Sequence, residues 1–258
     1  MSIRIVSVSG GVQSAVQADR VLQRYGPKGT TLWFADTTVE DEDLYRFLDD
    51  LERRWGKRIL RRRDGRTPLQ VSEEMGFIPT HRKAPCTFAL KVDLFVADLK
   101  RCPKPVTVYL GMAWWERHRM DTPKSRYEAV PGVTVEYPAL WQPMDRRPAL
   151  DVVRSWGIEP PRAYSLGFSH NNCGGACVKQ GHAEWLRLLK WKPELFKHYE
   201  DWEQSMRAKG PPLDDHAFCV DRRNGGYRPI TLTELRESRA EPPATGEDEA
   251  DGCIQCSI

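Results

Sequence analysis

The residues with the clearest chemical potential lie near the N-terminus, where a short apolar run ends in Ser9-Gly10-Gly11. A stretch with helical periodicity follows at once, so the pattern predicts a strand, a glycine turn and a helix start. Unpaired N–H groups at a helix start attract phosphate, and glycines let the backbone approach it. The sequence therefore predicts a nucleotide-binding loop made of Ser9, Gly10, Gly11, Val12, Gln13 and Ser14.

Cysteines form the second group of residues suited to chemistry. The chain has seven of them, and in a reducing compartment they favour metal, iron–sulfur or redox chemistry over structural disulfides. Cys173 and Cys177 enclose the sequence C-G-G-A-C, whose glycines suit a loop wrapped around a metal or cluster. Cys253 and Cys256 form a C-x-x-C pair near the C-terminus, where mobile thiols could visit an active site.

The elements that must position these residues alternate between strands and helices. Apolar runs predict strands over residues 4–8, 31–35, 58–62, 106–110 and 133–137. Periodicity predicts helices over residues 12–25, 41–55, 67–75, 86–100 and 148–156, and two more on either side of Lys192-Pro193. This alternation indicates an α/β protein with an open, mostly parallel sheet flanked by helices, whose ligands bind at the carboxyl ends of the strands.

The chain changes character after residue 165, which suggests three parts. We expect residues 1–165 to form the α/β nucleotide-binding domain and residues 166–236 to form a cysteine-containing loop with a helical appendage. Residues 237–258 read as a flexible acidic tail that ends in the C-x-x-C pair.

Composition and charge bear on partners and location. Lys and Arg (39) nearly balance Asp and Glu (36), so the net charge of +3 does not indicate a nucleic-acid partner. One basic segment runs from Arg53 to Arg66, and it is compatible with either a solvated charged face or a polyanion-binding surface. No apolar run is long enough to span a bilayer, and a signal peptide is not evident, so we expect a cytoplasmic protein without a membrane partner.

Several motifs together resemble a known family. The loop from Ser9 to Ser14 resembles the S-G-G-x-x-S loop of the PP-loop ATP pyrophosphatases, also called the adenine nucleotide alpha hydrolase-like superfamily. Within it, the chain is most similar to the phosphoadenosine phosphosulfate (PAPS) reductase group, over roughly residues 3–235. The supporting motifs are F-A-D-T at Phe34 to Thr37, C-x-x-x-x-K from Cys86 to Lys91, and Leu110-Gly111 followed by Glu116 and Arg119.

The resemblance implies that ATP or a related adenine nucleotide binds with its phosphates on this loop, and that Asp36, Thr37 and Gly111 lie near it. It also implies that Lys91 and Arg119 stabilise phosphate charge. Members of the superfamily cleave ATP at the α-phosphate and release pyrophosphate. Many adenylating members carry Asp where this chain has Gln13, and a neutral amide is a poorer ligand for Mg²⁺ than a carboxylate.

The resemblance also bears on the cysteines. Cys86 lies where iron–sulfur members of the group present a pair of cysteines, which implies a [4Fe-4S] cluster held by Cys86, Cys173 and Cys177. Zinc is the competing metal, with His170 or His182 as a fourth ligand.

Three functional hypotheses follow. The first is ATP-dependent adenylation with iron–sulfur-assisted sulfur transfer to a nucleobase or other nucleic-acid component, with a sulfur or electron donor protein as partner; a homodimer is compatible with it. The second is reduction of PAPS or its unphosphorylated relative, with Cys253 or Cys256 as the catalytic thiol that attacks sulfur. The third is a non-catalytic nucleotide-binding or DNA-associated subunit that binds polyanion through the basic segment.

Overall fold

The computed structural model describes residues 3–80, 83–221, 228–238 and 240–241. Its centre is a five-stranded sheet in the order β3-β2-β1-β4-β5, with every neighbouring pair parallel. The strands are β1 (Ile3–Ser7), β2 (Thr30–Ala35), β3 (Ile59–Arg62), β4 (Val106–Tyr109) and β5 (Val133–Glu136). The α/β class predicted from the sequence is confirmed.

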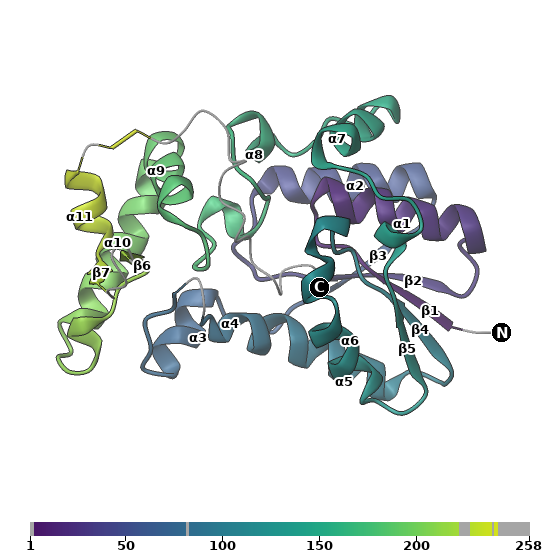
Figure 1. Ribbon diagram of the computed structural model, residues 1–258, viewed down its shortest axis with the longest axis horizontal. Coiled ribbons are helices and arrows are strands. Elements are labelled where there is room, and N and C mark those ends of the chain that lie inside the picture. The colour runs from purple at the N-terminus through teal and green to yellow at the C-terminus, as the bar shows by residue number, and fades with distance from the viewer. Residues whose placement is uncertain (1–2, 81–82, 222–227, 239, 242–258) are drawn as a thin grey trace.

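Helices cover both faces of this sheet (Figure 1). On one face lie α1 (Val12–Tyr25), α2 (Glu42–Trp55) and α7 (Arg146–Ser155), and on the other lie α5 (Asp93–Arg101) and α6 (Asp121–Glu128). Alternate residues of a strand point to opposite faces. Leu32 and Phe34 of β2 therefore pack with the first group of helices, and Trp33 and Ala35 pack with the second. Both faces of the sheet are thus buried, as is typical of parallel sheets.

The helix predicted over residues 86–100 is present but is not uniform. It starts as α4 (Pro85–Thr87), continues as a π-helical turn, η1 (Phe88–Val92), and becomes α5. The N–H of Asp93 reaches back five residues to the carbonyl of Phe88, which defines the π turn. Such turns are wider than α-helical ones and occur frequently at functional sites. Before it, α3 (Pro68–Glu74) begins with a capping box formed by Thr67 and Gln70.

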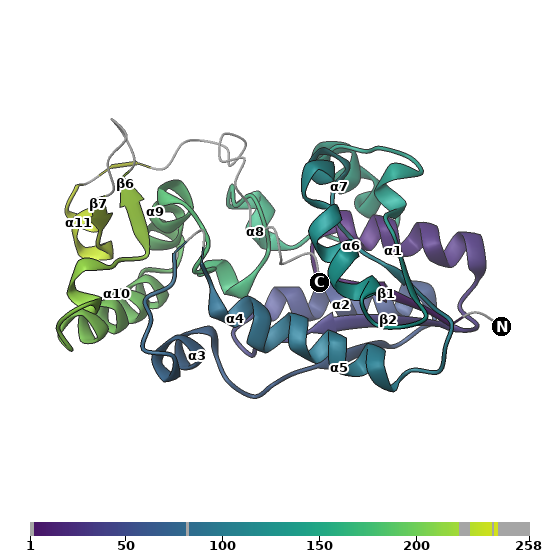
Figure 2. The ribbon, with the colours of Figure 1, turned by 60° about the horizontal axis from the view of Figure 1, so that its bottom comes forward.

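A second core lies beside the sheet domain. Its elements are α8 (Arg162–Ser165), α9 (His182–Trp191), α10 (Pro193–Arg207), the antiparallel pair β6 (Cys219–Asp221) and β7 (Arg228–Ile230), and α11 (Leu232–Glu237). Trp185, Phe196 and Phe218 pack together at its centre. Leu69 and Leu90 join the same cluster, so the segment around α3 and α4 packs with the C-terminal elements, and Figures 1 and 2 show α4 between the two parts.

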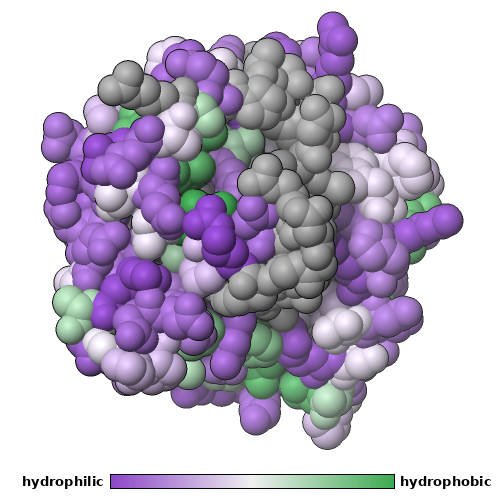
Figure 3. All heavy atoms as spheres, turned by 60° about the vertical axis from the view of Figure 1, so that its left-hand side comes forward, coloured by the Kyte–Doolittle hydropathy of each residue, from purple (hydrophilic) through white to green (hydrophobic). Residues whose placement is uncertain are grey.

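The helices of the C-terminal part turn their apolar residues inward. Leu186 and Leu188 of α9 are buried in the second core, and the face seen in Figure 3 is mainly hydrophilic outside the grey atoms, with small hydrophobic areas. Over the residues that the structure describes, no helix combines the length and the apolar character needed to cross a membrane.

Candidate functional site

The loop from Ser9 to Ser14 is ordered by hydrogen bonds among its own residues. The Oγ of Ser14 accepts a hydrogen bond from the Ser9 N–H at 3.1 Å and donates one to the carbonyl of Gly11 at 2.8 Å. Gly10 has φ +80°, and a Cβ there would lie 2.8 Å from Leu44 Cδ1. Because L-residues rarely adopt this φ and the space is filled, only glycine fits at this position.

The loop lies at the point of the sheet where open α/β folds bind ligands. The chain builds β1, β2 and β3 outward in one direction and then returns to place β4 on the other side of β1. Gly111 follows β4, and a Cβ there would lie 2.8 Å from Ser14 Cβ and 3.2 Å from the carbonyl of Ser7. The two strand ends therefore meet closely at the switch in strand order, where ligands of such folds bind.

Two residues from distant parts of the chain contact the loop. The N–H of Val12 donates to Tyr164 Oη at 3.3 Å, and Asn171 Nδ2 donates to the carbonyl of Gly10 at 3.3 Å. These partners lie 152 and 161 positions further along the chain. No local pattern could have identified them, since the contacts form only when the C-terminal part packs on the loop. Gln13 donates its side-chain amide to the carbonyl of Met144 at 3.2 Å.

Asp36, at the end of β2, is almost fully buried and is bonded through both carboxylate oxygens. It accepts hydrogen bonds from the Thr38 N–H at 2.9 Å, Tyr45 Oη at 2.7 Å and Arg63 at 2.7 Å. These bonds hold the turn that follows β2. The adjacent Thr37 donates its hydroxyl to Glu40 at 2.7 Å, and the same oxygen lies 3.9 Å from Cys173 Sγ. The end of β2, at the carboxyl edge of the sheet, thus lies next to a cysteine.

The three cysteines named from the sequence lie around one small cavity. Cys86, Cys173 and Cys177 line it together with Lys91 and Lys179. The cavity has a volume of about 10 Å³, which is room for about one water molecule. All five side chains are buried. We call this set the cysteine pocket. The sequence did not point to Lys179, two residues after Cys177, or to Glu40, which bonds to Thr37 and to Cys173 beside the pocket.

The charges in the cysteine pocket are unevenly distributed. The hydrogen bond from Cys173 lowers the pKa of Cys177 to about 6, against the opposing effect of burial. Burial and the neighbouring Cys177 raise the pKa of Cys86 to about 11. Burial favours the neutral form of Lys91, yet Cys173 and the other acidic neighbours raise its pKa overall. The lowered pKa of Cys177 and the raised pKa of Lys91 favour a thiolate beside an ammonium group in the pocket.

The arrangement of the three thiols determines which metal group the cysteine pocket could hold. In the described ranges, no three His, Cys, Asp or Glu side chains lie close enough together to hold a single metal ion. Zinc needs all its thiolate ligands within about 2.3 Å, whereas the irons of a [4Fe-4S] cluster each take a separate thiolate. Three thiols around one cavity supply the separate thiolates that three irons of a cluster need. Because the cavity has room for about one water molecule and Cys173 is hydrogen-bonded to Cys177, these thiols must move apart before a cluster can bind.

His170 provides a further observation at this place. Its buried Nδ1 has no hydrogen-bond partner among the described residues. Burial lowers the pKa of His170, and the charge of nearby Cys177 opposes that effect. A neutral imidazole nitrogen without a partner is able to ligate a metal; the role of His170 as a fourth zinc ligand stays a prediction.

The loop that carries Cys173 and Cys177 is held by contacts with the start of α2. Cys173 donates its N–H to Glu40 at 2.6 Å. Lys192 donates to the carbonyl of Gly174 at 2.7 Å and also pairs with Asp41. The pocket therefore depends on residues directly before α2 and at the junction of α9 and α10.

The remaining predicted residues fall in three places. Arg119 pairs with Glu116 at 3.3 Å, and its positive charge, together with burial, lowers the pKa of Lys179, so it lies near the cysteine pocket. His182 begins α9. Cys253 and Cys256 lie outside the described residues, so their role as catalytic thiols stays a prediction.

The basic segment is largely neutralised within the molecule. Each of its arginines forms an ion pair with a carboxylate of the same chain, which favours the solvated, internally paired interpretation over polyanion binding. The pairs are Arg53 with Asp50, Arg54 with Asp19, Arg58 with Glu52, Arg61 with Asp49, Arg62 with Asp98, Arg63 with Asp36, and Arg66 with Asp64 and Glu74.

Of three comparisons with known proteins, only the one with solved structures gave matches. No family model and no curated protein matches the chain. Among solved structures, the chain is similar to phosphoadenylyl-sulfate (PAPS) reductase from Candida auris, determined as a phosphate complex. The two chains are 14% identical with a TM-score of 0.43, over 66% of this chain and 80% of that one. At this level the similarity assigns no residue a role.

Proposed function

We propose that the protein is a PAPS reductase-like PP-loop enzyme that binds an adenine nucleotide on the Ser9 to Ser14 loop and performs sulfur chemistry at the cysteine pocket. The observation that carries the proposal is the contact between the two sites. Thr37 Oγ1 lies 3.9 Å from Cys173 Sγ, and Asn171, two residues before Cys173, donates to the carbonyl of Gly10 in the loop. A nucleotide on the loop would lie beside the thiols.

The chemistry assigned to each site follows from its groups. Ser9, Ser14 and the N–H groups at the start of α1 would hold phosphate, and Arg119 would offset negative charge nearby. Cys86, Cys173 and Cys177 would hold an iron–sulfur cluster. When bound, such a cluster would supply an iron without a cysteine ligand, at which sulfur could be held. The buried ammonium of Lys91 would stabilise the negative charge of the thiolates.

ATP-dependent sulfur transfer to a nucleobase is the reaction that best uses both sites. Adenylation by ATP joins an oxygen of the acceptor to AMP and releases pyrophosphate. A sulfur nucleophile then attacks the same carbon of the acceptor, and the oxygen leaves as part of AMP. The acceptor would be an RNA or DNA component.

One experiment tests both halves of the proposal. Protein purified anaerobically is analysed for iron and labile sulfide, and it is then incubated with ATP and RNA or DNA while AMP and pyrophosphate are measured. We expect bound iron and sulfide, and acceptor-dependent release of AMP and pyrophosphate. Protein without iron would exclude the cluster, and ATP that stays intact with every acceptor would exclude adenylation. A Ser14→Ala variant, which loses the hydroxyl that orders the loop, should bind iron as before but release less AMP.

A further inference from the structure

The hydroxyl of Tyr164 lies directly on the proposed phosphate-binding surface. Val12 is the first residue of α1, and its N–H donates to Tyr164 Oη at 3.3 Å. N–H groups in the first turn of a helix have no partner within the helix and are the groups that bind phosphate. A Cβ at Gly11 would lie 3.0 Å from the same oxygen. The hydroxyl therefore covers the part of the loop that a phosphate oxygen would contact.

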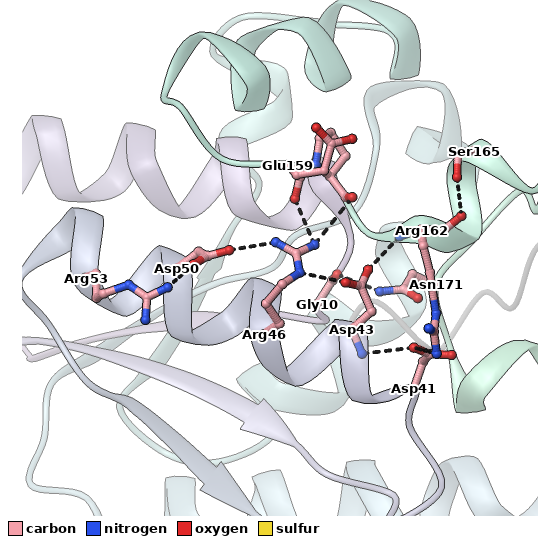
Figure 4. A network of polar contacts seen from close by, with 11 residues as sticks. Gly10, Asp41, Asp43, Arg46, Asp50, Arg53, Glu159, Arg162, Ser165 and Asn171 are labelled. Carbon is pink, nitrogen blue, oxygen red and sulfur yellow. Dashed lines mark hydrogen bonds and ion pairs between the residues drawn. The ribbon is translucent and has the colours of Figure 1, made fainter.

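Contacts with the start of α2 hold Tyr164 in this place. The backbone N–H of Arg162, two residues earlier in α8, donates to Asp43 Oδ2 at 2.6 Å. The guanidinium of Arg162 pairs with Asp41 at 2.7 Å. Figure 4 shows Arg162 lying between these carboxylates, with Asn171 directed at Gly10 beside them. These contacts anchor α8, and the ring of Tyr164 packs against the core of the sheet domain, so the hydroxyl is kept at the loop.

The Tyr164 hydroxyl still has a hydrogen to donate. A phenol has one O–H donor as well as acceptor capacity. Its oxygen accepts from Val12, and no residue in the described part of the chain accepts its proton. Burial raises the pKa of Tyr164, while Val12 and the positive charge of Arg146 oppose that rise, so the hydroxyl stays protonated at neutral pH. A protonated hydroxyl near a cation is suited to an anionic ligand.

We propose that Tyr164 is a phosphate-binding residue of the nucleotide site. A phosphate oxygen replaces Tyr164 Oη as the acceptor of the Val12 N–H, and the Tyr164 O–H then donates to that phosphate. In the free protein the same hydroxyl satisfies the N–H. This inference rests on the proposed nucleotide function, and it adds a ligand contact from the C-terminal part to a loop that lies wholly in the first 14 residues.

Binding measurements on the full chain test the inference. Dissociation constants for inorganic pyrophosphate, ATP and adenosine are measured by calorimetry for the wild type, Tyr164→Phe and the control Tyr137→Phe. Tyr137 donates its hydroxyl to the carbonyl of Met120 at 2.6 Å, away from the loop. Loss of a hydrogen bond to a charged group should weaken pyrophosphate and ATP binding about tenfold or more in Tyr164→Phe. Adenosine binding, and all binding by Tyr137→Phe, should stay at the wild-type level.

The outcomes separate this inference from the proposed function. If Tyr164→Phe binds pyrophosphate and ATP as tightly as the wild type, or more tightly, the hydroxyl only covers the free loop and the inference is wrong, while the nucleotide site stands. An equal loss for adenosine would show that the residue only shapes the site. A wild type that binds neither pyrophosphate nor ATP would remove the nucleotide site and the inference together.

Discussion

The loop from Ser9 to Ser14 and the cysteine pocket are neighbours, yet they are held in different ways. The loop is a continuous segment of six residues that is ordered by hydrogen bonds among Ser9, Gly11 and Ser14, and it also bonds to Met144, Tyr164 and Asn171. The pocket is assembled from residues 37–40, 86–91 and 173–179, and its loop is held by Glu40 and Lys192. This difference predicts that substitutions at Glu40 or Lys192 should disturb the pocket and spare the loop.

Removal of one pocket thiol should give the largest effect. Cys177→Ser eliminates the thiol with the lowest pKa and one of three proposed cluster ligands. We expect anaerobically purified Cys177→Ser to bind at least about tenfold less iron than the wild type, with unchanged affinity for ATP. Cys102→Ser is the control, because Cys102 packs at the edge of a different core. Equal iron content in the Cys177→Ser and Cys102→Ser variants would contradict the assignment.

Alanine at Gly10 should disturb the loop alone. The φ of +80° and the 2.8 Å approach of a Cβ to Leu44 should cost about 1–3 kcal/mol of stability. ATP should bind about 10-fold to 100-fold more weakly, while iron content stays at the wild-type level. Gly26→Ala is the matched control, since Gly26 also has a positive φ of +74°, has nothing within 4 Å of an added Cβ, and lies at the far end of α1. Urea unfolding and calorimetry measure both effects, and similar losses in the two variants would argue against a special role for the Gly10 conformation.

The core that supports the pocket should weaken as the pH rises. Burial raises the pKa of Glu203 from 4.5 to about 7, although the N–H groups of Phe218 and Leu232 donate to it at 2.8 and 2.7 Å. Because the folded protein holds this proton more tightly than the unfolded chain, its stabilising effect is complete below the unfolded pKa of 4.5 and is lost as the pH rises through about 7. The free energy of unfolding should fall by about 3 kcal/mol between pH 5 and pH 8.

Urea titrations followed by tryptophan fluorescence check this dependence, because Trp185 lies in the same core. The Glu203→Gln variant cannot titrate at this position and should show a flatter profile. A wild-type profile that rises toward pH 8, or an unchanged slope in Glu203→Gln, would show that another group controls the stability of this core.

The smallest effect should come from removing Lys192, the tether that holds the loop from Cys173 to Cys177. Lys192→Met removes the donor to the carbonyl of Gly174 and one partner of Asp41, which keeps its pair with Arg162. We expect a loss of about 1–2 kcal/mol in stability and faster reaction of the pocket thiols with an alkylating reagent, without a change in ATP affinity. Lys190→Met is the control, because Lys190 is exposed and pairs with Glu241 at 3.8 Å. Identical alkylation rates in the two variants would mean that the tether does not hold the loop.

Local sequence patterns were enough to predict the sheet and the loop. The helix after the loop spans residues 12–25 as expected, and the five predicted strands agree with the observed ones to within one or two residues. An apolar run that is followed by glycines and then by helical periodicity is a pattern of neighbouring residues, so the sequence alone reveals it. The three cysteines that the family resemblance grouped line one cavity, and their role as cluster ligands stays a prediction.

The elements that were missed carry weaker patterns. The pair β6 and β7 has three residues in each strand, too few for a clear alternation of apolar and polar residues. The π turn at η1 could not be predicted either, because its residues also suit an α-helix. It is defined by the hydrogen bond from the Asp93 N–H to the carbonyl of Phe88, and its residues pack into two cores, Leu90 in one and Val92 in the other.

The order of residues along the chain was thus sufficient for the α/β class, the position of the phosphate loop and the choice of cysteines, since each depends on residue type and short-range spacing. It could not reveal that Tyr164 and Asn171 close over the loop, that Glu40 and Lys192 hold the cysteine loop, or that the arginines of the basic segment are paired. Those contacts join residues far apart in the chain. They form only when the C-terminal core packs against the end of β2, because that packing brings their side chains within hydrogen-bonding distance.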